Sequence, residues 1–193
     1  MSALPRHRWT PEEYLAFEQQ SDTKHEYLDG EIYDMVGGTP RHNLIAANTI
    51  RLLGNALENN PCFVYTSDQG IKVKKTRNYF YPDVSVVCGE PEYEDNYLHN
   101  PTIIVEVLSP STEIYDRNTK FDNYRQIESL QAYVLIAQNR PRIDFFTRQG
   151  NLNQWLISEA VGLDAIVELP AIGCTLPLAG VYNKVSFDPE GTI

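Results

Sequence analysis

Two short stretches of the sequence constrain the fold most, because they consist almost entirely of apolar residues. Residues 84–88 and 102–108 are each as long as a strand and too short for a buried helix. A strand without polar alternation is typical of the centre of a sheet that is covered on both faces. The two stretches therefore predict an α/β fold, in which helices pack against a central sheet.

Helix signals flank these strands. A threonine, a proline and two acids at residues 10–13 predict a short helix through Phe17. Thr39-Pro40 opens a longer helix, which the Asn59-Asn60-Pro61 segment ends. Ser109-Pro110 predicts a helix that runs to about Glu128 and turns Ile114, Phe121, Tyr124 and Ile127 inward.

Further strands complete the predicted sheet. Asp29-Gly30 favours a tight turn and predicts a hairpin between residues 25–28 and 31–35. The alternation in residues 71–75 predicts a strand with Lys72 and Lys74 on one face. Other strands are expected at residues 62–66, 132–137, 142–147, 154–158 and 166–169.

Length and composition indicate one domain. The 193 residues contain no repeat, so we expect a single domain over residues 1–193 with its core from about residue 9 to residue 185. No apolar run is long enough to span a membrane and the first residues do not resemble a signal peptide, which predicts a cytoplasmic protein. Cys62, Cys88 and Cys174 are odd in number and far apart, so we expect reduced thiols.

Charge is distributed unevenly along the chain. The net charge of −10 argues against a nonspecific nucleic-acid coat, because phosphate binding requires local positive charge. Residues 69–82 nevertheless contain three lysines and an arginine without an acid, and an acidic segment at residues 90–95 follows. Two interpretations remain: a solvated hairpin, or a ribbon whose Lys72 and Lys74 contact DNA phosphates.

Glu106 is the most informative residue, because it interrupts an apolar strand. Burying its carboxylate without compensation would cost several kcal/mol, so it must be neutralised, paired with a cation or bound to a metal. Asp83 precedes the neighbouring apolar stretch. If the two strands are adjacent, the two carboxylates can share a hard cation such as Mg²⁺. The alternatives are a turn aspartate at Asp83 and a salt bridge from Glu106 to Arg125 or a lysine.

These residues belong to a longer pattern that resembles the Uma family of restriction-endonuclease-like proteins. The pattern comprises residues 26–31, His42, residues 81–87, residues 100–112, Asp116, Lys120 and Tyr124. The resemblance implies the fold of PD-(D/E)XK nucleases: a mixed central sheet flanked by helices, with an N-terminal helix and β-hairpin. In that fold an aspartate and a glutamate on adjacent strands hold Mg²⁺ (or Mn²⁺), and a lysine serves the attacking water. Nuclease relatives also lead us to expect a homodimer.

The sequence departs from the nuclease pattern at one position. Leu108 stands where the lysine is expected, two residues after the glutamate. Lys120 could supply the amine from the following helix, or it could be an exposed partner of Asp116 four residues away. Glu26, His42 and Asp116 are secondary candidates. The alternatives for the first two are a solvated hairpin acid and a surface histidine.

The sequence therefore predicts a metal-dependent endodeoxyribonuclease that acts on DNA. Asp83, Glu106 and the backbone carbonyl of Val107 would hold the metal, and Lys120 would orient or help to deprotonate the water and stabilise developing charge. Lys72 and Lys74 would guide the DNA backbone. A catalytically inactive binding or assembly module with the same fold is the alternative. Hydrolysis of a sugar or an ester ranks last, because paired carboxylates alone do not specify a substrate.

Overall fold

The computed structural model of the chain describes residues 7–35, 37–150 and 154–187. None of the helices formed by these residues is long and apolar enough to cross a membrane. The helices are α1 (Pro11–Glu18), α2 (Pro40–Leu57), α3 (Glu113–Tyr115), a π-helix (Asp116–Lys120), α4 (Phe121–Tyr124), a 3₁₀ turn (Pro170–Ile172) and α5 (Leu178–Val181). The strands are β1 (His25–Leu28), β2 (Glu31–Asp34), β3 (Cys62–Thr66), β4 (Ile71–Val73), β5 (Asn78–Phe80), β6 (Val84–Cys88), β7 (Tyr93–Glu94), β8 (Tyr97–Leu98), β9 (Ile103–Leu108), β10 (Ala132–Ala137), β11 (Arg142–Arg148), β12 (Trp155–Val161), β13 (Ile166–Leu169) and β14 (Cys174–Pro177).

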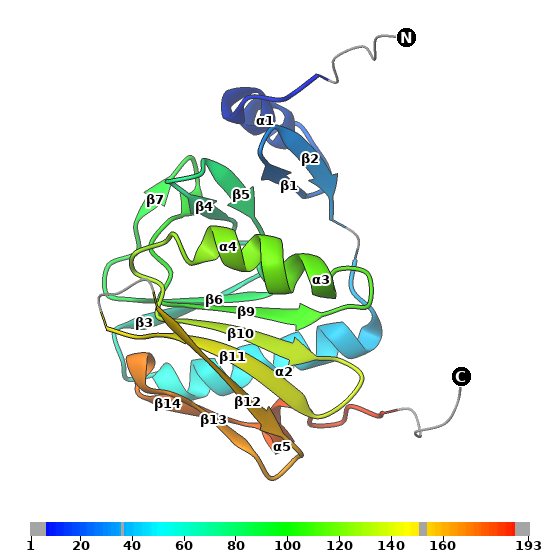
Figure 1. The fold of residues 1–193 in the computed structure, drawn as a ribbon, viewed down its shortest axis with the longest axis vertical. Helices are drawn as coiled ribbons and strands as arrows, with labels where there is room; N and C mark the ends of the chain where they lie inside the picture. The colour runs from blue at the N-terminus through cyan, green and yellow to red at the C-terminus, as the bar shows by residue number, and fades with distance from the viewer. Residues whose placement is uncertain (1–6, 36, 151–153, 188–193) are drawn as a thin grey trace.

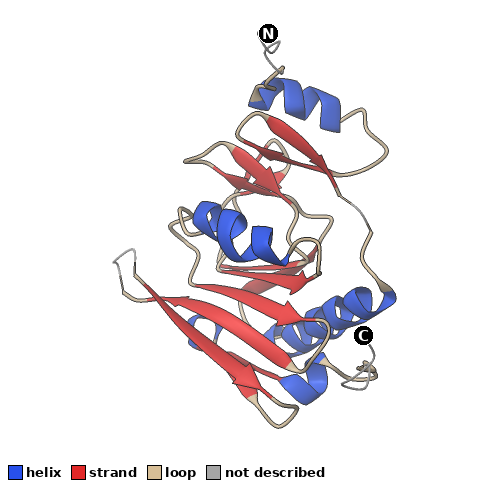
Figure 2. Cartoon of the chain, turned by 45° about the vertical axis from the view of Figure 1, so that its right-hand side comes forward, coloured by secondary structure: helices blue, strands red, loops and turns tan. Residues whose placement is uncertain are grey.

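A six-stranded mixed sheet forms the centre of the molecule, in the order β12-β11-β10-β9-β6-β3. Strands β9 and β10 are parallel, whereas the other neighbours in this sheet are antiparallel. The two apolar stretches of the sequence are β6 and β9, and they lie side by side with Val84 opposite Val105. Figure 2 shows the strands of this sheet stacked between helices. The expected mixed α/β architecture is confirmed.

The two faces of the central sheet are covered by different elements, which explains why its inner strands lack polar alternation. Alternate residues of β9 point to opposite faces. Val105 packs in the core that α2, β13, β14 and α5 cover. Ile104 packs in a second core with residues of α4 and of the smaller sheet. In Figure 1, α2 lies below the sheet and α4 above it.

The smaller sheet has the order β2-β1-β5-β4-β8-β7 and joins the N-terminal helix to the rest of the fold. Tyr14 of α1 packs against tyrosines on the outer side of this sheet and forms a tyrosine cluster with them. The Tyr97 hydroxyl is hydrogen-bonded to both Tyr14 and Tyr81, at 3.0 and 2.8 Å. The cluster comprises Tyr14, Tyr27, Tyr79, Tyr81 and Tyr97. It holds α1 and the β1–β2 hairpin at the upper end of the molecule in Figure 1.

Most predicted elements are present, but the helix predicted after Ser109 begins later and ends earlier than expected. The Ser109 hydroxyl accepts a hydrogen bond from the Thr112 backbone within a turn, so the helix begins only at Glu113. Helical structure ends at Tyr124 instead of Glu128, and Ile114, predicted to face inward, is 80% exposed. The strand predicted at residues 71–75 ends at Val73. The sequence patterns do not predict β5, β7, β8, β14 or α5.

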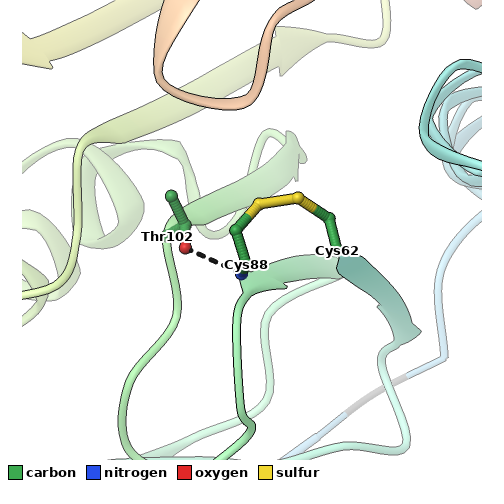
Figure 3. The surroundings of a disulfide bond; sticks show 3 residues. All are labelled: Cys62, Cys88 and Thr102. Carbon is green, nitrogen blue, oxygen red and sulfur yellow. Dashed lines mark hydrogen bonds between the residues drawn. A yellow bond between two sulfur atoms is a disulfide. The ribbon is translucent and has the colours of Figure 1, made fainter. Parts of the chain in front are cut away.

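The prediction that all three cysteines are reduced thiols is wrong for two of them. Cys62 on β3 and Cys88 on β6 are directly opposite each other in the antiparallel pair. Their Cα atoms are 4.0 Å apart and the two residues form a disulfide (Figure 3). Cys174 is free. Sequence spacing misses this bond because the 26-residue separation is closed by strand pairing, which the cysteine pattern does not reveal.

Candidate active site

Glu106 lies on β9, on the face of the central sheet that α4 and the smaller sheet cover. It is 4% exposed, as its place in an apolar strand predicted. The Oε1 atom accepts hydrogen bonds from the Lys120 ammonium at 3.1 Å and the Tyr124 hydroxyl at 3.2 Å. The cation that compensates Glu106 is therefore Lys120. The sequence allowed either a lysine or Arg125.

Lys120 ends the π-helix, and its ammonium is the centre of a carboxylate cluster. Its Nζ atom lies 2.9 Å from Glu26, 3.1 Å from Glu106 and 3.6 Å from Asp116. The side chain is only 7% exposed, so Lys120 is not the exposed partner of Asp116 that helix spacing alone allowed. The π-helix carries both Asp116 and Lys120, and π-helical turns occur frequently at functional sites.

Glu26 joins this cluster from the smaller sheet. Hairpin alternation favoured a solvated acid, but the structure buries Glu26 at 5% exposure. Its Oε1 atom accepts a hydrogen bond from the Tyr81 backbone N–H at 3.1 Å, in addition to the contact with Lys120. The alternation argument fails because β1 lies within a sheet whose inner face packs on the central one. Glu26 therefore faces the site and not the solvent.

Asp83 lies at the start of β6, next to Glu106. Its Oδ2 atom accepts a hydrogen bond from the Val107 backbone N–H at 2.7 Å, which fixes the carboxylate against β9. The side chain is 17% exposed, more than Glu106. The Asp83 charge also raises the pKa of Glu106. The pairing of β6 with β9 thus brings together the two carboxylates that the sequence predicted as a pair.

His42 approaches Asp83 from the first turn of α2. Its Nε2 atom lies 3.2 Å from Asp83 Oδ2, and its side chain is 15% exposed. Burial lowers the pKa of His42, but the hydrogen bond to Asp83 and the Asp83 charge outweigh burial, so the pKa is raised. A chain of hydrogen bonds holds this helix end, from the Thr39 hydroxyl to Gln138 and from Gln138 to the Leu108 carbonyl. His42 is therefore a fixed neighbour of the site.

The cluster contains more negative than positive charge. Burial, and then the charges of Asp116, Asp83 and Glu26, raise the pKa of Glu106 well above its ordinary value, although Lys120 lowers it. Burial also raises the pKa of Asp116. Burial lowers the pKa of Lys120, but the surrounding carboxylates raise this pKa by more than burial lowers it, so the net shift is upward. Lys120 is therefore an ammonium donor at neutral pH and cannot accept a proton from water there.

The available oxygen atoms fit a hard divalent cation. In their contacts with other described residues, Asp83, Glu106 and Glu26 each use one carboxylate oxygen, so the second oxygen is available for a ligand. In the described ranges, no group of three or more His, Cys, Asp or Glu side chains is arranged to hold a metal ion. Mg²⁺ commonly uses one or two carboxylates and keeps several waters. The site thus fits such a cation better than a closed zinc cage.

The structure does not bring Lys72 and Lys74 into this cluster. Lys72 is opposite Tyr79, which is opposite Tyr27, so these side chains share one face of the smaller sheet. Glu26 precedes Tyr27 and points to the other face. Lys72 is paired with the acidic hairpin between β7 and β8, through Glu94 and, at 3.1 Å, Asp95. Lys74 lies beyond the end of β4, and its ammonium is 3.9 Å from Glu94 and half-exposed.

Comparison with known proteins assigns the chain to a family. The family model described as "Uma2: Putative restriction endonuclease" matches residues 11–179. The chain belongs to the Uma2 family. This match includes the residues of the candidate active site, Glu26, His42, Asp83, Glu106, Asp116 and Lys120, and confirms the resemblance seen in the sequence. Membership in the Uma2 family supports a nuclease function.

Two curated relatives extend over nearly the same length. The chain is 37% identical over 186 residues to the uncharacterized protein slr1290 of Synechocystis sp., covering 96% of this chain and 97% of the relative. It is 38% identical over 162 residues to the uncharacterized protein sll1609 of the same organism, covering 82% and 91%. The similarity to these relatives therefore extends over most of the chain.

A solved structure shares the fold. The crystal structure of a nuclease from Anabaena variabilis, described as putative and belonging to DUF820, superposes with a TM-score of 0.75. The alignment covers 90% of this chain and 97% of that chain at 16% sequence identity. This likeness confirms the restriction-endonuclease-like fold predicted from the sequence.

Three side chains of the candidate active site were given no role by the sequence. Tyr124 donates to Glu106, Gln138 positions α2, and Tyr115 lies beside Lys120, with the ammonium 5.8 Å from the ring centre. Tyr124 was predicted to face inward and belongs to the family pattern, but neither observation gave it a role in the site. Gln138 follows the apolar strand β10 directly, so a polar residue at a strand end was the available signal.

Proposed function

We propose that this protein is a Mg²⁺-dependent endodeoxyribonuclease, able to use Mn²⁺, that hydrolyses phosphodiester bonds in DNA. The observation that carries the proposal is the meeting of Asp83, Glu106 and Lys120, which come from three different segments of the chain. Structural ion pairs also bury acids, but this cluster has an excess of carboxylates and free oxygens beside its lysine. A dication supplies the charge that such a cluster lacks.

Asp83, Glu106 and the backbone carbonyl of Val107 would hold the cation. When bound, it would polarise the scissile phosphate and lower the pKa of a water molecule. The Val107 N–H fixes Asp83, and the Tyr124 hydroxyl fixes Glu106. Rigid carboxylates of this kind keep a reactive site in its working geometry without reorganisation.

Lys120 would stabilise negative charge on the phosphate. Its raised pKa keeps it protonated, so it serves as a hydrogen-bond donor and orients water or phosphate oxygen atoms. Lys120 comes from the π-helix and not from the strand position of Leu108. This placement supports a migrated lysine, since the Lys120 ammonium still reaches Glu106.

A plasmid-nicking assay tests the proposal. Supercoiled DNA has no ends, so conversion to open circles in Mg²⁺ reports endonuclease activity. We expect Asp83→Asn, Glu106→Gln and Lys120→Met to abolish nicking. Asp122→Asn is the matched control, because this acid is 69% exposed and pairs with Arg125 at the surface. Full activity in all three site variants would reject the assignment.

DNA contact by the basic ribbon and dimerisation belong to the same proposal. For Lys72, a phosphate would have to replace Glu94 and Asp95. Lys72→Ala and Lys74→Ala should each reduce the slope of log Kd against log salt by about 1. An unchanged slope would show that this residue does not contact DNA.

Light scattering tests the proposed dimer. It should give a mass of twice the 22.0 kDa of one chain, and the mass of one chain would contradict the dimer.

A non-catalytic binding or assembly module is the second candidate. The salt bridge between Glu106 and Lys120 favours it, because an ion pair already compensates the buried acid. Mg²⁺ or Mn²⁺ distinguishes the two candidates: a cation that binds the folded state raises the melting temperature. A rise that Asp83→Asn abolishes supports the nuclease. No rise in the wild-type protein supports the module.

A further inference from the structure

Tyr115 has a buried hydroxyl without a partner at the edge of the candidate active site. Within the part of the chain that the structure describes, few buried side-chain polar atoms lack a partner: His42 Nδ1, Ser85 Oγ, Tyr115 Oη, Arg125 Nε and Trp155 Nε1. A buried polar group without a hydrogen bond loses its hydration and gains nothing in return, so folded proteins satisfy most of them. An exception of this kind requires a reason.

The surroundings of Tyr115 connect it to the acid–lysine cluster. Lys120 Nζ lies 5.8 Å from the centre of the Tyr115 ring. The ring also lies 6.3 Å from Tyr33, which is 41% exposed. Tyr33 is opposite Glu26 in the hairpin and shares its face. Tyr115 thus contacts both the buried cluster and a partly exposed aromatic side chain.

The hydroxyl is suited to donate a hydrogen bond to an anion. Burial, and then the Glu26 charge, raise the pKa of Tyr115, so the phenol keeps its proton at neutral pH. Tyr124 differs in this respect, because its hydroxyl already donates to Glu106. Hydrogen bonds to ionised acceptors are about twice as strong as those between neutral groups. A phosphate oxygen would supply the acceptor that the protein does not.

A second unpartnered atom lies at the other side of the cluster. His42 Nε2 contacts Asp83, whereas the buried Nδ1 has no partner. The backbone of Gly38 lies against this ring, since a Cβ added at Gly38 would meet His42 Nδ1 at 2.5 Å. Two orphaned polar atoms therefore flank the same carboxylates. This arrangement is expected of a site that a polar ligand completes.

We propose that Tyr115 contacts the substrate, its phenolic O–H donating a hydrogen bond to a phosphate oxygen of the DNA strand bound at the Glu26–Lys120 cluster. The proposal rests on the nuclease function proposed above and adds a residue to it. It assigns a role to a hydroxyl that no hydrogen bond among the described residues explains.

The test compares three tyrosine-to-phenylalanine variants. Tyr115→Phe should leave the melting temperature of the free protein unchanged or raise it, because it removes an unsatisfied donor. Its kcat/KM on plasmid DNA in Mg²⁺ should fall about 10- to 100-fold. Tyr124→Phe should lower the melting temperature, because its hydroxyl has a buried partner. Tyr33→Phe should change neither the melting temperature nor kcat/KM, since its hydroxyl donates to the exposed Glu31.

Binding of a short fluorescein-labelled DNA duplex in Ca²⁺ separates the two proposals. Weaker binding by Tyr115→Phe at an unchanged melting temperature supports the contact, even if the wild-type protein does not cleave DNA and the nuclease proposal fails. Equal binding and equal cleavage by wild type and variant overturn the contact and leave the nuclease standing. A lower melting temperature for Tyr115→Phe also overturns it, because the hydroxyl then has a structural partner. A wild-type protein that neither binds nor cleaves the duplex overturns both.

Discussion

Replacing Lys120 by methionine removes the ammonium that compensates the buried carboxylates while nearly keeping the volume of the side chain. The ammonium lies within 3.6 Å of Glu26, Glu106 and Asp116, and all these side chains are at most 7% exposed. Removing one partner of a buried ion pair leaves the other charge without compensation. We expect the variant to lose about 3–5 kcal/mol of unfolding free energy near neutral pH.

The loss should depend on pH, because the carboxylates can take up a proton instead. Burial already raises the pKa of Glu106, and without Lys120 the opposing influence disappears. Between its unfolded pKa near 4.5 and its raised folded pKa, the folded variant binds about one more proton than the unfolded chain. Its stability therefore falls as pH rises, by about 1.4 kcal/mol per unit. Because Lys120 lowers the pKa of Glu106 in the wild type, the variant should bind this proton over a wider pH range and lose more stability than the wild type between pH 5.5 and 7.5.

Urea unfolding at pH 5.5, 6.5 and 7.5 measures this loss. Lys74→Met is the matched control: its ammonium is 53% exposed and 3.9 Å from Glu94, so the change should stay within about 0.5 kcal/mol at every pH. A Lys120→Met variant that loses less than about 1 kcal/mol at neutral pH, or the same amount at all three pH values, would refute the reasoning.

Two further predictions concern neighbouring parts of the fold. Asp83 raises the pKa of His42, so this interaction stabilises the protein fully below the unfolded pKa of about 6.5 and is lost as pH rises through the folded pKa. The difference in unfolding free energy between wild type and His42→Gln should therefore shrink between pH 5.5 and 8.5. A difference that stays constant over this range would contradict the stabilising role of the His42–Asp83 interaction. Reducing the Cys62–Cys88 disulfide should lower the unfolding free energy by about 3.5 kcal/mol for its 26-residue separation, as urea unfolding with and without dithiothreitol would measure. Thiol titration of the unfolded, unreduced chain should find Cys174 alone, and three thiols would contradict the pairing.

The sequence predicts the centre of the site better than its periphery. Glu106 was identifiable because a carboxylate within an apolar strand has few explanations, and Asp83 because it precedes the other apolar strand. Both inferences depend on strands that neighbour each other, which β6 and β9 do. Glu26 was harder to predict as a site residue, since its burial depends on how the smaller sheet packs and not on its own hairpin. Local alternation contains no information about that packing.

The exposure of Ile114 and the burial of Lys72 both differ from the sequence pattern, and they have similar causes. Ile114 fits a helical period, but the chain reaches the helix through a turn and leaves that side chain in solvent. Lys72 follows an alternating pattern that suggests a solvated face, yet the acidic hairpin folds over it and leaves it 8% exposed. Tertiary contacts determine both outcomes. A pattern within one segment cannot reveal which distant segment will cover it.

A crystal structure with Mn²⁺ tests the central claim most directly, because the anomalous signal of the metal identifies its position. We expect one peak bonded to a carboxylate oxygen of Asp83 and to the second oxygen of Glu106, with Lys120 still contacting the first. A peak elsewhere, or no peak at saturating Mn²⁺ with Glu106 bound only by Lys120 and Tyr124, would contradict the metal site and the hydrolysis that depends on it.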